Sequence, residues 1–396
     1  MRPSSSRLIS GLAVSAAAAL ALVGCSSPQQ AANGPSGDDN PYKVGIITSQ
    51  TGALASYGAQ YLAGFDAGLA YATNGTNKVG NHPVQVQKVD DGGDPAKAVS
   101  SATDLIGQGY KILAGSAVSG IALQLAPVAE QNKVLFISGP AATDAITGAN
   151  KYTFRSGRQS LQDVEVAKSY LGDATGKKIV VFAQDTAFGQ ANVAAVTAVA
   201  TGANIVPVLV PESESVFSTW AKKALDEKPD LVFVAWAGTT AAAMWQGLDQ
   251  QGVLTATTVV TGLADRVTWP ALGEVGTKIK FLAHYFDGAS DTPASQALKT
   301  ALGQPIDLFN PDGFTAAQMI VHALEASGDS VDSQISALEG WKFDSVKGAY
   351  QVRASDHALL QPMYQTKLTS DGTNYKAELI KAVPGDEVAP PETPFK

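Results

Sequence analysis

One stretch in the first half of the chain combines groups suited to holding an anion. Residues 134–137 are apolar and predict a buried strand, which ends at Gly139 and Pro140. The small-residue turn that follows contains Thr143 and Asp144, two typical helix-capping residues. A strand that feeds a loop and then a helix start presents backbone N–H groups and the positive end of the helix dipole to a ligand. The pattern therefore favours an anion site, although an ordinary turn without a ligand has the same pattern.

Motifs for catalysis or metal binding do not occur in the sequence. It has no HExxH, no G-x-S-x-G, no P-loop and no G-x-G-x-x-G, and its four histidines are scattered. The acidic turn at 90–94 is similar to part of a calcium loop. It lacks the downstream glutamate of an EF-hand, and Asp94 is placed to cap a helix. We therefore expect no catalytic residue, no metal and no cofactor.

The composition is typical of a globular protein with a large core. Of 396 residues, 45% are hydrophobic and 16% are charged, and this length predicts two or three domains. The formal net charge is −8, and without two arginines of the leader it is −10, from 26 basic and 36 acidic residues. A net negative charge argues against nucleic acid or an anionic surface as a partner.

The first 41 residues predict an export leader and a tether. Two arginines precede an apolar run that is too short and too rich in alanine for a permanent membrane span. The run ends in the four residues from Leu22 to Cys25, which resemble a bacterial lipobox, and Cys25 is the only cysteine in the chain. We predict a signal peptide at 1–24, lipidation at Cys25 and a flexible tether at 25–41, which would hold the protein on the outer face of the cytoplasmic membrane.

From residue 42 onward, strand and helix patterns alternate along the chain. The first run predicts strands at 44–47, 84–86, 112–113 and 134–137, with amphipathic helices between them. The second run predicts strands at 179–182, 205–210, 231–235 and 257–261, with helices at 188–200, 217–226 and 241–252. Such an alternation predicts an α/β fold with two similar lobes, each built on a mostly parallel sheet with helices on both faces.

The last part of the chain departs from this alternation. It carries helical patterns at 294–302 and 314–326, and then antiparallel-looking strands at 349–352, 363–368 and 376–381. Residues 384–396 contain four prolines and predict a loose tail.

These features together resemble the branched-chain amino acid (leucine/isoleucine/valine) binding proteins. The resemblance rests on the leader, the first strand and its loop, the turn Asp90-Asp91-Gly92-Gly93-Asp94-Pro95 and the turn Pro140-Ala141-Ala142-Thr143, in this order over residues 42–381. These are type I periplasmic binding proteins, which deliver solutes to ABC importers. The family fold implies two Rossmann-like lobes that close on a solute.

The resemblance also implies where the lobes are divided. Three crossovers are expected near 155–160, 284–287 and 346–350. The first lobe would then comprise 42–157 plus 286–346, and the second lobe 158–285 plus 347–383.

Ligand contacts in the first lobe follow from the same resemblance. Ser119 and Thr143 would donate hydroxyl and backbone N–H hydrogen bonds to a ligand carboxylate. The carbonyls of Ala141 and Ala142 would accept from an ammonium or another donor. Tyr57 would form a wall of the pocket for the ligand's side chain.

The second lobe departs from the family pattern. Phe188 stands where amino-acid binders often have a tyrosine, and Leu263 is nearest to the position of the acidic residue that faces the α-ammonium. Asp265 could replace that acid only if its loop is shifted, and Trp236 would add apolar surface. Because an ammonium without an anionic partner is costly in a closed cleft, we expect a small carboxylate or amide with an apolar or aromatic body. A branched-chain amino acid receptor that uses Asp265 is the alternative.

The leading hypothesis for function is a lipid-anchored, non-enzymatic solute-binding protein of an ABC importer. It would be a monomer whose partners are a small-molecule solute, the importer permease and, through the lipid, the membrane. A sensory receptor of the same fold is the second hypothesis. An exported enzyme is the third, and it would need a catalytic constellation that the sequence does not display.

Overall fold

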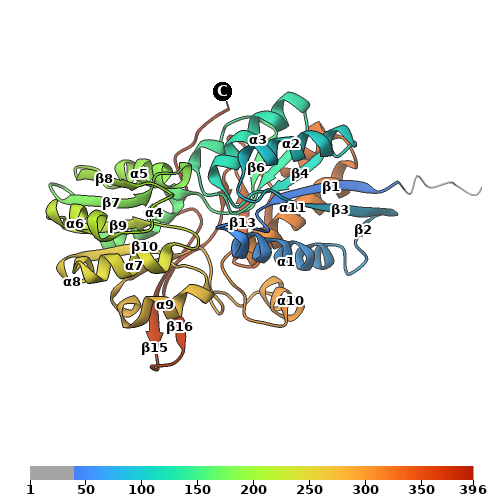
Figure 1. Cartoon of the computed structure of the whole chain (residues 1–396). Coiled ribbons are helices and arrows are strands. Elements are labelled where there is room, and N and C mark those ends of the chain that lie inside the picture. The colour runs from blue at the N-terminus through green and yellow to red at the C-terminus, as the bar shows by residue number, and fades with distance from the viewer. Residues whose placement is uncertain (1–39, 396) are drawn as a thin grey trace, which may run out of the picture. The chain divides into compact units, whose positions relative to one another are not determined.

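Two large sheets organise residues 40–395, the part of the chain that the computed structural model describes. Figure 1 shows them as two groups of strands, each flanked by its own helices. This arrangement confirms the predicted α/β fold with two lobes. The predicted signal peptide and Cys25 lie outside the described residues.

The first sheet has six strands in the order β2-β3-β1-β4-β5-β6. All of its pairings are parallel except that of β2 with β3. Its strands β4 and β5 are buried along their whole length, as the continuous apolar runs of a sheet covered on both faces predict. The strands and their helices are β1 (Tyr42–Thr48), α1 (Ala55–Ala72), β2 (Lys78–Val79), β3 (His82–Asp90), α2 (Pro95–Gly107), β4 (Ile112–Gly115), α3 (Ser119–Asn132), β5 (Leu135–Ser138) and β6 (Thr153–Arg155).

Asp94 caps α2 as predicted. Its carboxylate accepts from the backbone N–H groups of Ala96 and Lys97, and Pro95 occupies the first turn of the helix. The two aspartates before it bind the first loop, because Asp90 accepts from Thr51 and Asp91 accepts from Ser49. The acidic turn therefore holds the loop after β1 against the loop after β3, at the carboxyl edge of the first sheet.

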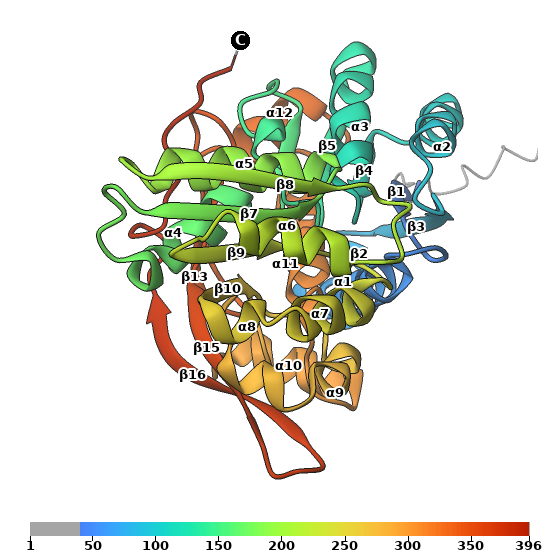
Figure 2. The same ribbon diagram turned by 60° about the vertical axis from the view of Figure 1, so that its left-hand side comes forward.

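The second sheet has seven strands in the order β16-β15-β11-β10-β9-β7-β8. The five central and outer strands from β11 to β8 are parallel, and β15 and β16 add an antiparallel hairpin at one edge, drawn in red in Figure 2. Alternate residues of β7 enter different cores, since Val180 and Phe182 pack on one face of the sheet and Ile179 and Val181 on the other. The strands are β7 (Lys178–Gln184), β8 (Asn204–Val210), β9 (Leu231–Ala235), β10 (Thr258–Gly262), β11 (Lys280–Ala283), β15 (Met363–Ser370) and β16 (Tyr375–Val383).

Six α-helices lie between the strands of this second lobe. The sequence predicted three of them, at 188–200, 217–226 and 241–252, and missed the other three. The helices are α4 (Ser160–Leu171), α5 (Ala187–Val199), α6 (Ser218–Asp226), α7 (Ala241–Gln250), α8 (Val253–Ala256) and α9 (Trp269–Leu272).

Helix α11 (Asn310–Ser327) packs closely against α1 of the first lobe. Glycines make this approach possible, since a Cβ atom on Gly64 would lie 1.9 Å from the carbonyl oxygen of Asn310, and one on Gly313 would lie 1.9 Å from that of Tyr61. The late helices α10 (Pro293–Leu302) and α12 (Val331–Leu338) lie on either side of α11 in the chain.

The third crossover differs from the expected position at 346–350. Strands β12 (Lys342–Ser345), β13 (Gly348–Val352) and β14 (Leu359–Leu360) form a small antiparallel sheet. Tyr350, Val352 and Leu359 are buried in the core of the first lobe. We therefore propose that the chain crosses to the second lobe after Leu360, where β15 begins three residues later.

The prediction of a loose tail was wrong for residues 384–395. Val388 is buried, Arg353 donates to the carbonyl of Pro390 at 2.7 Å, and the N–H of Thr393 donates to Asp356 at 3.0 Å. A high proline content indicates an extended chain, but it does not show whether the carbonyls of that chain find donors.

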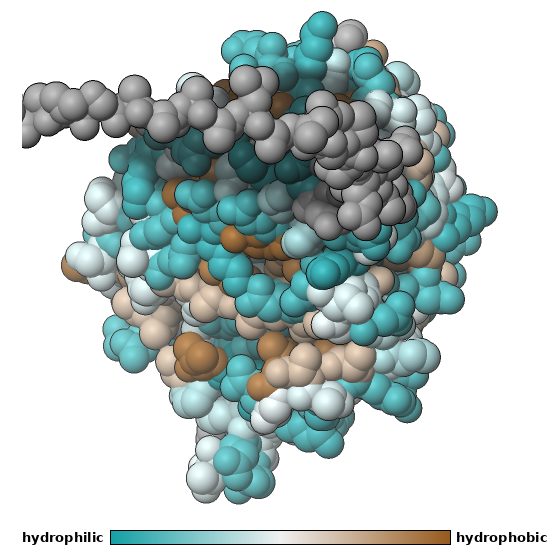
Figure 3. All heavy atoms as spheres, turned by 90° about the vertical axis from the view of Figure 1, so that its right-hand side faces the viewer, coloured by the Kyte–Doolittle hydropathy of each residue, from teal (hydrophilic) through white to brown (hydrophobic). Residues whose placement is uncertain are grey.

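The face of the molecule turned to the viewer in Figure 3 is mainly hydrophilic, with small separate hydrophobic spots. Among residues 40–395, no helix has both the length and the apolar character that crossing a membrane requires.

Candidate functional site

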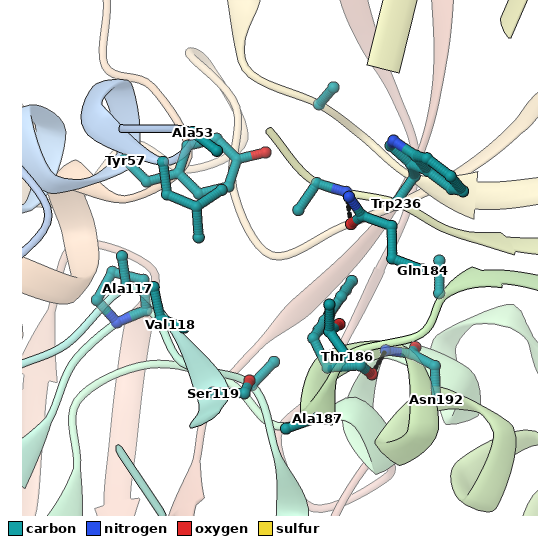
Figure 4. Close-up of a pocket in the computed structure, with 18 of the residues that line it drawn as sticks. Ala53, Tyr57, Ala117, Val118, Ser119, Gln184, Thr186, Ala187, Asn192 and Trp236 are labelled. Carbon is teal, nitrogen blue, oxygen red and sulfur yellow. Dashed lines mark hydrogen bonds between the residues drawn. The ribbon is translucent and has the colours of Figure 1, made fainter. Parts of the chain in front are cut away.

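A cavity of about 580 Å³ lies where the carboxyl ends of strands from the two sheets face each other. In Figure 4, Tyr57 and Ser119 lie on one side of it, and Gln184, Asn192 and Trp236 lie on the other. Its volume falls in the range of sites for small molecules. Six of the sequence-predicted site residues line it, namely Tyr57, Ser119, Ala142, Phe188, Trp236 and Leu263.

The start of α3 lines the first-lobe side of the cavity. Ser119 is the first residue of the helix and, with Gly120, lines the cavity, and no side chain caps this end. The N–H groups of Ser119 and Gly120 therefore remain for an anion, whereas that of Ile121 donates to the carbonyl of Val118 at 3.1 Å. The Ser119 Oγ accepts from the backbone N–H of Thr143 at 3.3 Å, which leaves its hydroxyl proton for a ligand.

Thr143 lies behind Ser119 and does not line the cavity. It is 3% exposed, and its carbonyl accepts from Arg155 Nη2 at 2.7 Å. The helix that Thr143 and Asp144 were predicted to cap is a single 3-10 turn at Asp144–Ile146. The chain must leave this turn to form β6 beside β5, so the helix start that faces the cavity is that of α3.

The carbonyls of the Ala141-Ala142 turn are not placed as expected. Ala141 is buried and does not line the cavity, and its N–H donates to the carbonyl of Ser116 at 3.1 Å. Ala142 lines the cavity, but its carbonyl already accepts from both the N–H and the hydroxyl of Ser160, at 2.8 and 3.1 Å. A ligand ammonium would have to compete with these bonds.

Arg158, in the segment where the first crossover is expected, lines the cavity. Its Nε donates to Asp163 at 3.2 Å and its Nη1 donates to the carbonyl of Pro140 at 2.7 Å. No hydrogen bond to another described residue uses Nη2. Burial raises the pKa of Asp163, and the charge of Arg158 opposes that rise. Sequence reasoning noted Arg158 only as part of a crossover, although two arginines in a nearly uncharged stretch were a usable signal.

The second lobe contributes aromatic and aliphatic side chains to the cavity wall, together with polar ones. Phe188 follows the N-cap Thr186 of α5, and Leu263 is 4% exposed after β10. The ring of Trp236 packs near Phe182 and Phe217, and its Nε1 donates to the hydroxyl of Thr240 at 3.1 Å. The indole therefore presents carbon surface to the cavity, with its polar atom already satisfied.

Asp265 does not line the cavity. It is 3% exposed and accepts from the hydroxyl of Ser56 on α1 at 2.7 Å. This hydrogen bond joins the two lobes at the rim. The carboxylate therefore serves an inter-lobe contact in this structure and does not point to a ligand ammonium.

Tyr57 closes the first-lobe side of the cavity against a second aromatic ring. Its ring centre lies 4.4 Å from that of Phe309, which also lines the cavity. Burial, with the charge of Asp265, raises the pKa of the Tyr57 hydroxyl, which therefore stays protonated at neutral pH.

His284, in the segment where the second crossover is expected, lines the cavity and was not predicted as a site residue. Its Nε2 is buried without a hydrogen-bond partner among the described residues. Burial, and next the positive charge of Arg158, lower its pKa well below the usual value, so the imidazole is neutral.

The comparisons with known proteins agree with this geometry. The sequence profile of the periplasmic binding protein family matches residues 41–373. The Leu/Ile/Val-binding protein homolog 6 of Brucella suis biovar 1 is 26% identical over 358 residues, which cover 85% of this chain and 90% of the relative.

Two solved structures from Rhodopseudomonas palustris are similar. The structure of an ABC-type branched-chain amino acid transporter has a TM-score of 0.75 at 30% identity and covers 90% of this chain and 100% of its own. A solute-binding protein of an ABC transporter, in complex with 4-hydroxybenzoate, has a TM-score of 0.79 at 22% identity, with coverage of 87% and 97%. The chain belongs to the periplasmic binding protein family, as an extracytoplasmic solute-binding protein of ABC transporters.

Proposed function

We propose that this protein binds a small carboxylate-bearing solute with an apolar or aromatic body and delivers it to an ABC importer. One observation carries the proposal: the uncapped start of α3 and the Arg158 guanidinium share a cavity with a largely apolar opposite wall. The carboxylate would bind Ser119, the first-turn N–H groups of α3 and Arg158 Nη2. The body would lie against Phe188, Trp236 and Leu263.

The acidic residues on the cavity wall give little support to an ammonium. Asp163 is paired with Arg158, and Asp185 accepts from Gln190 at 2.9 Å. Asp185 and Glu212 are exposed. Since Asp265 is held by Ser56 and Leu263 occupies the neighbouring wall, an α-amino acid would bury its ammonium without a dedicated partner. The Rhodopseudomonas palustris protein that was solved in complex with 4-hydroxybenzoate has the same fold. Its complex is consistent with an aromatic carboxylate as the solute of this protein.

The experiment that tests this proposal is mass spectrometry of the small molecule retained after native purification. A carboxylate without an amino group supports the proposal, and retained leucine, isoleucine or valine overturns its ligand class. The same ligand at about 100 times its dissociation constant should stabilise the protein by about 2.7 kcal/mol. Steady conversion of that ligand to a product would favour an enzyme instead of a transport protein.

The proposal includes a lipid anchor at Cys25 and a monomeric, non-catalytic protein with a permease as partner. The lone cysteine at the end of the apolar leader supports the anchor. Cys25→Ala should abolish labelling by a fatty-acid probe and release the protein from the membrane fraction. Equal labelling of Cys25→Ala and the parent would contradict the anchor.

A further inference from the structure

Gln184 places a polar side chain on the second-lobe wall of the cavity, which Phe188 and Trp236 also line. It is the last residue of β7, directly after the buried apolar run of that strand, and it is 7% exposed. Figure 4 shows its side chain beside Trp236, facing the side of the cavity that carries Tyr57 and Ser119. A buried amide on the wall of a binding cavity needs hydrogen-bond partners.

The orientation of this amide is fixed by the backbone. The N–H of Ala237 donates to Gln184 Oε1 at 3.0 Å. Because a backbone N–H can only donate, the carbonyl oxygen of the amide must face Ala237, and Nε2 with its two N–H donors lies on the other side. No described residue accepts a hydrogen bond from Nε2.

Other N–H donors of this wall are already used. Trp236 Nε1 donates to Thr240, and Asn192 Nδ2 donates to the carbonyl of Phe188 at 2.9 Å. Of the three side chains Gln184, Asn192 and Trp236, Gln184 is therefore the one whose N–H donor a solute can reach without displacing a protein contact.

We infer that Gln184 selects carboxylate solutes that also carry a hydrogen-bond acceptor oxygen at the end remote from the carboxylate. This inference rests on the proposed function, in which the carboxylate binds the first lobe. A hydroxyl, ether or carbonyl oxygen opposite Nε2 satisfies the amide, whereas an apolar end leaves it desolvated and unpaired. The expected class is a small acid with oxygen at both ends and an apolar or aromatic middle.

Calorimetry with matched carboxylates tests the inference. Benzoate is compared with 4-hydroxybenzoate and 4-methoxybenzoate, and pentanoate is compared with 4-oxopentanoate. The parent protein should bind the acids with an additional oxygen remote from the carboxylate about tenfold more tightly than benzoate or pentanoate. Gln184→Met, which keeps the length of the side chain and removes both the donor and the oxygen that accepts from Ala237 N–H, should abolish this preference.

Gln184→Glu sharpens the result because it keeps an oxygen for Ala237 N–H and replaces the donor by an acceptor. This variant should reject 4-methoxybenzoate, which can only accept, and retain 4-hydroxybenzoate, which can donate. Gln190→Met is the matched control, since Gln190 is exposed on α5 and does not line the cavity. It should leave every preference unchanged.

Two results would contradict the inference in different ways. If carboxylates bind and Gln184→Met keeps the parent preference, Gln184 does not select the solute and the proposed function stands. If none of these carboxylates binds the parent protein, while a solute without a carboxylate does, the proposed function fails together with the inference.

Discussion

The two walls of the cavity use different kinds of contact. On the first-lobe side, the contacts come from the backbone at the start of α3, from Ser119 and from Arg158 in the adjoining crossover. On the second-lobe side, they come from aromatic and aliphatic side chains and from polar side chains, of which the Gln184 amide keeps a donor without a protein partner among the described residues. Backbone donors at a strand-to-helix junction follow from the fold itself, whereas side chains on the opposite wall can be replaced without changing the fold. We propose that the first wall anchors the carboxylate and the second wall selects among carboxylates.

The largest expected effect is that of Arg158→Met. Arg158 and Asp163 form an ion pair whose side chains are only 10% and 7% exposed, so removal of the cation leaves a buried carboxylate unpaired. The free energy of unfolding should fall by about 3–5 kcal/mol, measured by urea denaturation, and carboxylate binding should be lost. The double variant Arg158→Met/Asp163→Leu should regain most of the stability without regaining affinity. Parent-like affinity in the double variant would show that the first wall does not use Arg158.

Removal of the Ser119 hydroxyl should weaken carboxylate binding tenfold to a hundredfold. The loss corresponds to about 1.5–3 kcal/mol for one hydrogen bond to a charged group. Thr143→Ala is the comparison, since it keeps the backbone N–H that donates to Ser119 and removes a side chain outside the cavity. It should weaken binding less than about fivefold. Equal losses in the two variants would place Thr143 in direct contact with the ligand.

His284, on the cavity wall, should make the stability of the protein depend on pH. His284 is kept neutral by burial, while the unfolded chain takes up a proton below about pH 6.5. The unfolded state then binds more protons, so His284 makes stability fall as pH falls, by up to about 1.4 kcal/mol per pH unit. His284→Gln should show a shallower loss between pH 7 and pH 5 in urea denaturation. An unchanged slope would show that this imidazole is protonated in the folded protein.

A carboxylate added to the second wall should shift the ligand preference of the protein toward amino acids. Leu263→Glu supplies a partner for an ammonium and should raise the affinity for leucine, relative to its keto acid 4-methyl-2-oxopentanoate, by about tenfold. Leu263→Gln has the same size without the charge and should leave the ratio unchanged. If Leu263→Glu also leaves the ratio unchanged, the ammonium of leucine does not face this wall.

The smallest effect is expected for Asp265→Ala. Loss of its hydrogen bond to Ser56 should weaken closure of the lobes and lower the affinity for leucine and for the keto acid alike, by about two- to tenfold. Ser56→Ala should have the same effect. A loss confined to leucine would instead assign Asp265 to the ammonium.

Local signals in the sequence predicted the elements well. The cap at Asp94, the strand at Leu231–Ala235 and the two lobes follow from residue types close together in the chain. They could not show that Ser56 meets Asp265, 209 residues away, or that Arg158 turns into the cavity. The same local signals could not show that Ser119 lines the cavity while Thr143 lies directly behind it. The two residues are far apart in the chain and meet only through a hydrogen bond in the folded protein.

The most direct test of the central claim is calorimetry with leucine, 4-methyl-2-oxopentanoate and 4-hydroxybenzoate on the same preparation of the parent protein. Leucine and its keto acid share the carboxylate and the side chain and differ at the α-carbon, which carries an ammonium in one and a carbonyl in the other. We expect the keto acid or the aromatic acid to bind at least tenfold more tightly than leucine, since the second wall offers the ammonium no anionic partner. Tight binding of leucine, with weak binding of both other acids, would contradict the account.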